Sequence, residues 1–359
     1  MEAPLEKLLD GTEEPPCLLV ADTFLLEAAV RVAGRRNIPV AAFWPTSVAM
    51  FTLYQHLHLL EQNGHYNLQL SEANDVRVDY VPGLSPTSLH EILGVFNGLH
   101  DFILPKFREA FSLVPKTQCV MISSIYELEP QALDRLRAIL KTPLLTVAPP
   151  TSNVAHGPSH HVDQDYIKWL DGRPEDSVLY IAFGSHVPVS PQQMDEVMAG
   201  LRETGVNFLL VARSNTDGLK ELRGDKGFVV PWCDQVRVLS HRSVGGFWSH
   251  CGWNSTKEGV MAGVTFLTFP FYGDQILISK LIVEDWRIGL KVKERHDEAL
   301  VPREKIVEVV KKIMDPNHNE SKEMRKRAKE MKERVLENGS LGENIDSFVK
   351  VIRSVSKNQ

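Results

Sequence analysis

Cysteine is scarce in this sequence, and its spacing excludes a disulfide framework. The 359 residues include four cysteines, with no C-x-x-C pair among them. They are Cys17, Cys119, Cys233 and Cys251. Scattered cysteines of this kind indicate free thiols in a reducing compartment.

Long apolar runs and an excess of positive charge are also lacking. No run approaches the ~18 apolar residues that a membrane span needs, and the opening MEAPLEKLLDGTEEPP has no apolar core of a signal peptide. The formal net charge of -6 at pH 7 is unsuited to tracking a phosphate backbone. We therefore expect a cytoplasmic monomer that binds neither nucleic acid nor a membrane.

Two common phosphate-binding motifs are missing. The sequence contains neither G-x-G-x-x-G nor G-x-x-x-x-G-K-[ST], so a dinucleotide-binding protein and a P-loop protein lose their main support. Short apolar runs instead alternate with amphipathic stretches, which favours an α/β fold with parallel sheets. A length of 359 residues predicts two domains rather than one.

The alternation of strands and helices runs through both halves of the chain. It predicts strands at 17–21, 39–43, 119–123, 144–147, 178–183, 208–211, 228–230, 244–248 and 266–269. It predicts one helix that follows the strand at 39–43 and includes residues 54 and 60. It predicts further helices at 23–36, around 96–113, and at 126–140, 191–203, 255–262, 274–284, 304–314, 322–336 and 345–355. Ser190 is the expected N-cap of the helix at 191–203, and the mixed charges of 322–336 predict a solvated helix face.

The stretch APPTSNVAHGPSHH between the halves is rich in Pro, Ser and His, and it reads as a linker. Its histidines, His156, His160 and His161, have no cysteine or carboxylate at ligand spacing. We expect no metal site there.

One segment, VGGFWSHCGWNSTKEGV, has the pattern of a strand, a tight loop and a helix. The first backbone N–H groups of such a helix form an anion site at the carboxyl edge of a parallel sheet, and a pyrophosphate fits it. Asn254 and Ser255 can cap the helix and also donate to phosphate oxygens, while Glu258 one turn later can accept hydrogen bonds from a ribose diol. Taken alone, N-S-x-x-E is better explained as two cap residues and a capping-box glutamate.

The wider segment from Trp232 to Gln275 closely resembles, without a gap, the signature box of plant secondary-product UDP-glycosyltransferases. The matches include Trp232, Gln235, Val236, Leu239, His241, Val244, Gly245, Phe247, His250 to Ser255, Glu258, Gly263, Val264, Pro270, Asp274 and Gln275. YIKWLDGRPEDSVLYIAFGS and VADTFLLEAAVRVAGRRNIPVAAFWPTS resemble two further parts of the same family. The resemblance implies the GT-B fold, in which two Rossmann-like, doubly wound domains face a cleft.

The resemblance also implies how the chain is divided. Residues 1–148 are expected to form an acceptor-binding domain that is incomplete at its start, and 149–165 a linker. Residues 166–338 are expected to form the UDP-sugar-binding domain, and 339–359 a helix that packs back on the N-terminal domain.

For the nucleoside of the donor, the resemblance implies four ligands. Trp232 stacks its indole on the uracil ring, and the backbone around Cys233 reads the edge of the base. Gln235 approaches the ribose, and Glu258 accepts its hydroxyls. Cys233-Asp234 replaces the family's usual Ala-Pro, and we expect a modest effect because this pair works mainly through its backbone.

For the pyrophosphate, the resemblance implies His250, Asn254, Ser255 and the helix N-terminus, with Ser185 reaching it from the FGS turn. No metal or other cofactor is implied, and UDP-glucose is the expected donor.

For the sugar, the resemblance implies contacts from Trp253, Asp274 and Gln275. In this family a final Gln accompanies glucose and a final His accompanies galactose, so Gln275 favours UDP-glucose.

The family's catalytic base is a histidine that an aspartate orients, following the logic of a catalytic triad. Asp22 matches that aspartate, although from its position it could equally cap a helix beginning near Thr23. The histidine belongs on a first strand–helix turn that should precede 17–21, so the chain looks truncated at its N-terminus. His56 and His58 lie on a predicted helix, where packing or surface roles are expected instead.

These observations lead to two main hypotheses. The first is a glucosyltransferase that transfers glucose with inversion from UDP-glucose to a hydroxyl or carboxyl of a small acceptor. The second is a catalytically impaired UDP-sugar-binding fragment or pseudoenzyme without the base histidine. A nucleotide-sugar epimerase on the same fold is a third, weaker hypothesis. Aromatic residues of the first half could line an acceptor cleft, but such side chains are more often core. They are Phe43, Trp44, Phe51, Tyr54, Phe96 and Phe102.

Overall fold

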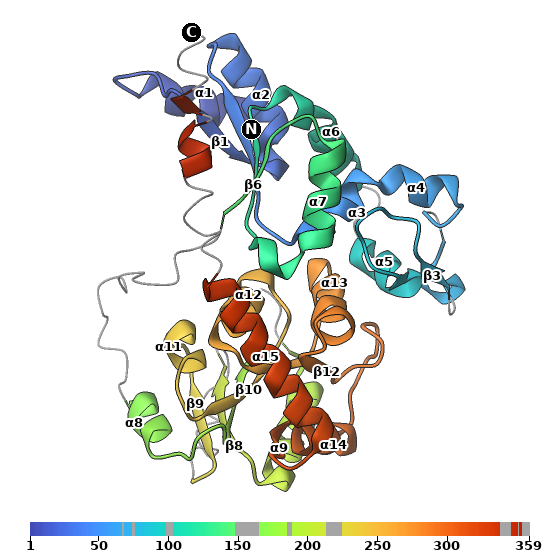
Figure 1. Ribbon diagram of the computed structural model, residues 1–359, viewed down its shortest axis with the longest axis vertical. Coiled ribbons are helices and arrows are strands. Elements are labelled where there is room, and N and C mark those ends of the chain that lie inside the picture. The colour runs from blue at the N-terminus through green and yellow to red at the C-terminus, as the bar shows by residue number, and fades with distance from the viewer. Residues whose placement is uncertain are drawn as a thin grey trace. The chain divides into compact units, whose positions relative to one another are not determined.

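The computed structural model describes two compact units, shown in Figure 1. The described residues are 1–66, 68–73, 76–97, 103–147, 165–184, 189–212, 225–337, 346–350 and 352–353. Unit 1 comprises Met1–Pro150 with Glu337–Gln359, and unit 2 comprises Thr151–Leu336. Within the described parts of both units, no helix combines the length and the apolar character that crossing a membrane requires. Residues 149–164 of the predicted linker lie outside the described residues, and Asp165, its predicted last residue, already begins a helix.

Unit 1 is built on a parallel sheet in the order β1-β2-β5-β6. The strands are β1 (Leu19–Asp22), β2 (Val40–Trp44), β5 (Val120–Ile122) and β6 (Leu144–Thr146). A separate antiparallel pair consists of β3 (Arg77–Val78) and β4 (Thr87–Ser88). Among the described strands β1 lies at the edge of its sheet and pairs with β2.

Helix α1 precedes β1, and the other helices of unit 1 alternate with its strands. They are α1 (Glu2–Asp10), α2 (Leu26–Arg35), α3 (Val48–Gln55), α4 (Leu57–Gln62), α5 (Leu89–Phe96), α6 (Ile103–Leu113) and α7 (Pro130–Ile139). Single 3-10 turns are η1 (Thr23–Leu25), η2 (Leu70–Glu72), η3 (Val114–Lys116) and η4 (Tyr126–Leu128). Ion pairs join α1 to the end of α2, where Arg35 contacts Glu2 and Glu6, and Arg36 contacts Glu6 and Asp10.

An aromatic cluster fills the core of unit 1 beside β2. Trp44 lies 5.6 Å from Phe51 and 5.7 Å from Tyr54 between ring centroids, and all three side chains are buried. Phe96 is buried as well and lies 5.6 Å from Tyr54. These four aromatics are therefore core residues, as the more common case predicts, while Phe102 lies outside the described residues.

Unit 2 is built on a six-stranded parallel sheet in the order β12-β11-β10-β7-β8-β9. The strands are β7 (Val178–Ala182), β8 (Asn207–Val211), β9 (Gly227–Val230), β10 (Val244–Ser249), β11 (Thr265–Thr268) and β12 (Gly289–Lys291). Trp248 of β10 pairs with Ile181 of β7 and with Leu267 of β11. The order reverses between β7 and β10, which makes this the switch point where ligands bind in open α/β sheets.

The helices of unit 2 cover both faces of this sheet. They are α8 (Asp165–Asp171), α9 (Pro191–Thr204), α11 (Gln235–Leu239), α12 (Trp253–Ala262), α13 (Asp274–Lys280), α14 (Arg303–Met314) and α15 (Asn319–Glu337). One face packs Ile181 and Trp248 against α9 and α14. On the other face, a Cβ on Gly259 of α12 would lie 2.4 Å from Phe266, so glycine is needed for this close approach.

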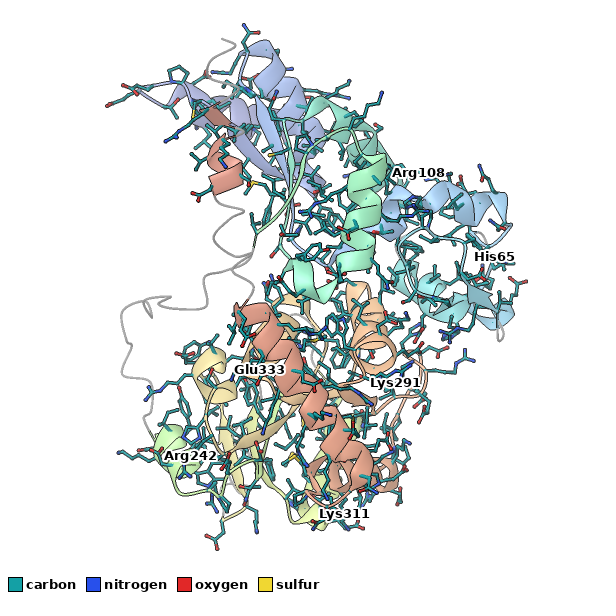
Figure 2. All side chains as sticks on the ribbon, in the orientation of Figure 1. His65, Arg108, Arg242, Lys291, Lys311 and Glu333 are labelled. Carbon is teal, nitrogen blue, oxygen red and sulfur yellow. The ribbon has the colours of Figure 1, made fainter. Side chains whose placement is uncertain are left out.

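The C-terminal helix of unit 2, α15, is amphipathic rather than polar all round. Its exposed charged residues include Glu333, and Figure 2 labels this residue together with Lys311 of α14. Met324, Ala328, Met331 and Val335 form a buried stripe at the spacing of one helix face. The predicted solvated face is present, and it lies opposite this stripe.

Several predicted boundaries were wrong for local reasons. The predicted helix 96–113 is α6 in its later part, whereas Phe96 is the last residue of α5. The predicted helix 274–284 changes after Lys280 into a π-helix, η5 (Leu281–Asp285). The strand β12 was missed because it is only three residues long and begins with glycine. Ser190 was predicted correctly, since its hydroxyl accepts a hydrogen bond from the Gln193 backbone at 3.2 Å.

Candidate functional site

The candidate site begins where the chain leaves β10 at the switch point of the sheet. Every residue of β10 is buried, and the chain then turns through His250, Cys251 and Gly252 into α12. Cys251 has a positive φ of 66°, which turns the backbone sharply toward the helix. The N-cap of α12 is Gly252, which has no side chain with which to cap. The first N–H groups of α12 therefore lie at the carboxyl edge of the sheet, where an anion is favoured.

This start of α12 corrects one interpretation of N-S-x-x-E. Asn254 and Ser255 lie inside the first turn of α12 rather than at its cap, and Asn254 is exposed. Glu258 bonds to Gln235 of the neighbouring helix α11. The capping-box explanation for these residues is therefore wrong.

The imidazole of His250 lies in a slot between two glycines. A Cβ on Gly184, which follows β7, would lie 2.8 Å from Nε2 of His250, and a Cβ on Gly252 would lie 2.4 Å from the same atom. Gly184 also has a φ of +79°, a conformation that side chains disfavour. Both positions require glycine to hold the half-buried ring in this place. Ser185 lies outside the described residues.

A chain of hydrogen bonds connects α11 with α12. Nε2 of Gln235 donates to Oγ of Ser255 at 2.9 Å and to Oε2 of Glu258 at 2.7 Å. The hydroxyl of Tyr180, on β7, donates to Oε1 of Gln235 at 3.1 Å. Burial raises the pKa of Glu258, and the bond from Gln235 partly offsets this rise. Sequence analysis missed Tyr180, whose only signal was a hydroxyl in the apolar run VLYIAF.

The segment between β9 and α11 presents an aromatic surface. Trp232 is 51% exposed, which leaves its indole open for stacking against a flat ring. Cys233 is buried, and its Sγ lies 3.4 Å from the Tyr180 hydroxyl. Asp234 caps α11 by accepting from the Arg237 backbone at 3.1 Å. All four cysteines are free thiols, as predicted.

A third segment of the site lies between β11 and α13. Gly273 has a φ of 61° and precedes Asp274, the first residue of α13. The buried Gln275 accepts a hydrogen bond from the Phe271 backbone through Oε1 at 2.9 Å. Its amide nitrogen is thereby directed away from Phe271. Asp274 is half-buried.

Trp253, like Cys233 and Gln275, is buried. Its ring centroid lies 6.4 Å from that of Trp286, and Nζ of Lys257 lies 5.9 Å from the centre of its ring. The indole thus packs in the interior of unit 2.

In unit 1, Asp22 is the last residue of β1, at the carboxyl edge of its sheet. Its Oδ1 accepts a hydrogen bond from the Phe24 backbone at 2.9 Å, so it caps η1 as one interpretation of the sequence predicted. His56 is buried, with Nδ1 2.8 Å from the Thr52 carbonyl, and burial lowers its pKa. The packing role expected for His56 is confirmed.

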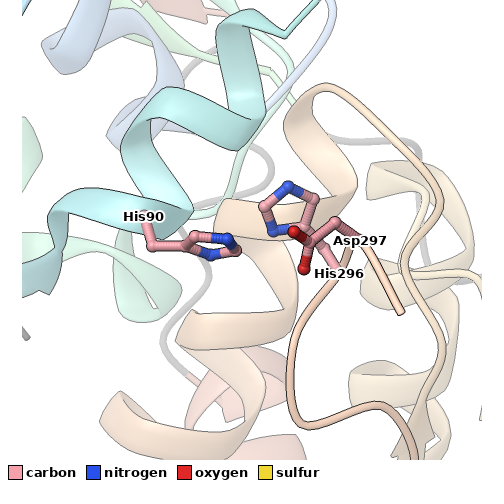
Figure 3. A group of neighbouring side chains, drawn as sticks. All are labelled: His90, His296 and Asp297. Carbon is pink, nitrogen blue, oxygen red and sulfur yellow. The ribbon is translucent and has the colours of Figure 1, made fainter. Parts of the chain in front are cut away.

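Figure 3 draws three side chains of the kind that bind metals, and they belong to different units. His90 lies on α5 in unit 1, whereas His296 and Asp297 lie between β12 and α14 in unit 2. Neither unit by itself contains all three of these side chains.

Sequence and structure comparisons identify the family. The family model described as UDP-glucoronosyl and UDP-glucosyl transferase matches residues 143–327. The chain is 43% identical over 364 residues to UDP-glycosyltransferase 87A1 of Arabidopsis thaliana, covering 99% of this chain and 82% of that protein. This chain belongs to the plant UDP-glycosyltransferase family. It is therefore a glycosyltransferase by family.

Solved structures of this UDP-glycosyltransferase family share the fold. A UDP-glucosyltransferase from Polygonum tinctorium capable of glucosylating indoxyl matches with a TM-score of 0.86 at 25% identity, over 98% of this chain and 80% of that one. UGT71G1 of Medicago truncatula, complexed with UDP-glucose, matches with a TM-score of 0.80 at 28% identity, over 98% and 78% of the two chains. The predicted GT-B class, with Rossmann-like parallel sheets, is confirmed.

Proposed function

We propose that this UDP-glycosyltransferase uses UDP-glucose and transfers glucose with inversion to a hydroxyl or carboxyl of a small acceptor. The observation that carries the proposal is the clustering of donor-binding chemistry at the carboxyl edge of one sheet in unit 2. An exposed indole, a carboxylate beside an amide, and a helix N-terminus with glycine at its N-cap follow β9 and β10. The indole suits a nucleobase, the carboxylate suits a ribose, and the helix N-terminus suits a pyrophosphate.

The nucleoside is proposed to lie against the segment that follows β9. Trp232 offers its exposed face to uracil, and the backbone at Cys233 pairs with the edge of the base. Glu258 accepts hydrogen bonds from the ribose hydroxyls, and its ionised form does so most strongly because both oxygens then only accept. Gln235 donates to that carboxylate and so favours its ionised form.

The pyrophosphate is proposed to lie at the N-terminus of α12. Backbone N–H groups there, together with Asn254, Ser255 and His250, can donate to its oxygens. Stabilising the negative charge on UDP as it departs lowers the barrier of the transfer step. The same contacts hold the anomeric carbon in place for attack by the acceptor.

The sugar is proposed to lie against the start of α13. Gln275 uses its oxygen to accept from Phe271, so its amide group is the part that can donate to a sugar hydroxyl. The side chain of Asp274 is half-buried and adds an acceptor. Since the Trp253 indole is buried, we propose that its backbone N–H, rather than its ring, faces the donor.

Attack by the acceptor hydroxyl needs a general base that removes its proton. Asp22 is proposed as the carboxylate that orients this base. Its place at the carboxyl end of β1 supports this role, and its bond to Phe24 fixes one oxygen of the carboxylate. A base of this kind accelerates transfer typically by about 10²–10⁴-fold.

The test separates binding from turnover. The chain is titrated with UDP by calorimetry and then incubated with UDP-glucose and a panel of phenolic and terpenoid acceptors, with UDP release measured. We expect binding and glucoside formation. Binding without any glucoside would support a protein that holds UDP-sugars without turnover, and a lack of UDP binding would refute the proposed donor site.

A further inference from the structure

Gln235 has little hydrogen-bonding capacity left for a ligand. Its amide nitrogen carries two hydrogens, and both are used, one toward Ser255 at 2.9 Å and one toward Glu258 at 2.7 Å. A carboxylate only accepts, so the nitrogen of the amide must face Glu258. The oxygen of the amide must therefore face Tyr180, whose hydroxyl lies 3.1 Å away and donates to it.

The Tyr180 hydroxyl is in turn held in position by Cys233. A phenol has one hydrogen, and this one is given to Gln235. At 3.4 Å from the same oxygen, the Cys233 thiol therefore acts as the donor and Tyr180 as its acceptor. Burial raises the pKa of the thiol to about 11 and that of the phenol well above its ordinary value. Both groups stay protonated through the neutral range and keep this direction of donation.

Resting on the function proposed above, we propose that Tyr180 and Cys233 are positioning residues for recognition of the donor's ribose. Their hydroxyl and thiol orient the Gln235 amide, which directs the Glu258 carboxylate toward the ribose diol. The same amide donates to Ser255, so the Ser255 hydroxyl directs its own hydrogen toward the pyrophosphate. The chain of donors runs from Cys233 through Tyr180 and Gln235 to Glu258.

Tyr180→Phe removes one atom from this chain and preserves the packing around it. The ring of Tyr180 stacks on Phe247 with centroids 5.1 Å apart and an interplanar angle of 24°, and a phenylalanine retains that contact. The substitution leaves Oε1 of Gln235 without its donor. The amide is then held only through its nitrogen, and the Glu258 carboxylate is oriented less firmly.

The measurement is the ratio of the dissociation constants of 2′-deoxy-UDP and UDP, obtained by calorimetry. A hydrogen bond to a charged group predicts that the wild type prefers UDP by at least about tenfold. In Tyr180→Phe we expect UDP to bind about 3- to 10-fold more weakly and 2′-deoxy-UDP to change less than about twofold. The KM for UDP-glucose should rise by the same factor as the UDP dissociation constant, with kcat unchanged.

Two further variants complete the test. Cys233→Ala should lower the ratio about twofold, and Cys233→Ser, which keeps a donor, should restore it. Thr265→Val is the matched control, because it also removes a buried hydroxyl, one that donates to the Gly245 carbonyl at 3.1 Å at the opposite end of the sheet. This control should leave the ratio unchanged.

The outcomes are distinguishable from failure of the proposed function. If the wild type does not bind UDP, the donor site itself is refuted. Suppose instead that the wild type binds UDP and prefers it to 2′-deoxy-UDP. If the ratio of the two dissociation constants is then the same in Tyr180→Phe, even with both ligands bound more weakly, Tyr180 has no positioning role. An unchanged ratio in Cys233→Ala would remove Cys233 from the chain of donors.

Discussion

Gly252 is the position at which the structure makes its sharpest prediction. A Cβ there would lie 2.4 Å from Nε2 of His250 and 3.0 Å from Cε1. Comfortable contact between such atoms begins near roughly 3.5 Å, so the imidazole must move by about 1 Å. The backbone of Gly252, with φ -61° and ψ 140°, suits alanine without strain. Gly252→Ala therefore acts on the site mainly by displacing His250.

We expect Gly252→Ala to weaken UDP binding by about 10- to 100-fold in calorimetry. A hydrogen bond to a charged phosphate contributes about 1.5–3 kcal/mol, and 1.4 kcal/mol corresponds to about tenfold in affinity. A displacement of about 1 Å exceeds the roughly 0.5 Å tolerance of a binding constellation, so most of that contribution is lost. The melting temperature should change little, because His250 is half-buried and can swing aside.

Gly205→Ala is the matched control for this prediction. Gly205 ends α9 with a φ of 67°, and a Cβ there would meet nothing within 4 Å. Alanine should cost about 1 kcal/mol of folding stability there and leave UDP affinity unchanged. On a His250→Ala background, Gly252→Ala should weaken UDP binding by less than about twofold. The reasoning would be refuted if Gly252→Ala bound UDP with wild-type affinity. It would also be refuted if Gly252→Ala weakened UDP binding as much on the His250→Ala background as it does in the wild type.

Three further predictions concern single groups of the donor site. Trp232→Ala should weaken UDP binding about tenfold in calorimetry with the melting temperature nearly unchanged, because the indole is 51% exposed and acts by stacking; a large drop in melting temperature would contradict this. The pKa of Glu258 is raised above its ordinary 4.5, so UDP affinity should decrease as pH falls through that raised pKa. The free energy of unfolding should instead decrease as pH rises from 4.5 through the raised pKa, because the folded state holds the proton more tightly than the unfolded state. Both pH dependences, measured at several pH values, should flatten in Glu258→Gln. Gln275→Glu keeps the acceptor for Phe271 and loses the donor, so kcat/KM with UDP-glucose should fall about tenfold, and Gln275→His should shift preference toward UDP-galactose; unchanged donor kinetics in both would remove Gln275 from sugar recognition.

Local pattern predicted the elements of unit 2 with few errors. The strand at 178–183 was recognised because a buried parallel strand is apolar throughout. The helix at 191–203 was recognised because Ser190 and Pro191 are a standard start. Elements that depend on neighbours were harder to predict. β12 is three residues long and exists through its pairing with β11, and the π-turn after Lys280 interrupts a pattern that looks continuous.

The site divides in the same way. Trp232, His250, Glu258 and Gln275 were singled out from the sequence, because a resemblance spanning an unbroken segment assigns roles position by position. The alternative of a capping box could not be excluded until the structure gave the first residue of α12. For Asp22 the structure shows a capping bond from the Phe24 backbone, as the interpretation of Asp22 as a cap predicts. This bond does not contradict the interpretation of Asp22 as the aspartate that orients the base.

The sequence by itself determined the α/β class, the family and the segment that holds the donor chemistry, because these depend on residues that are close together along the chain. Only the tertiary structure decided how distant residues act on that segment. It placed Gly184, which follows β7, against His250. It also placed the Tyr180 hydroxyl against Gln235, 55 residues away in the chain. Such contacts arise because parallel strands lie side by side in one sheet and the segments that follow them gather near one edge, whatever the length of chain between them.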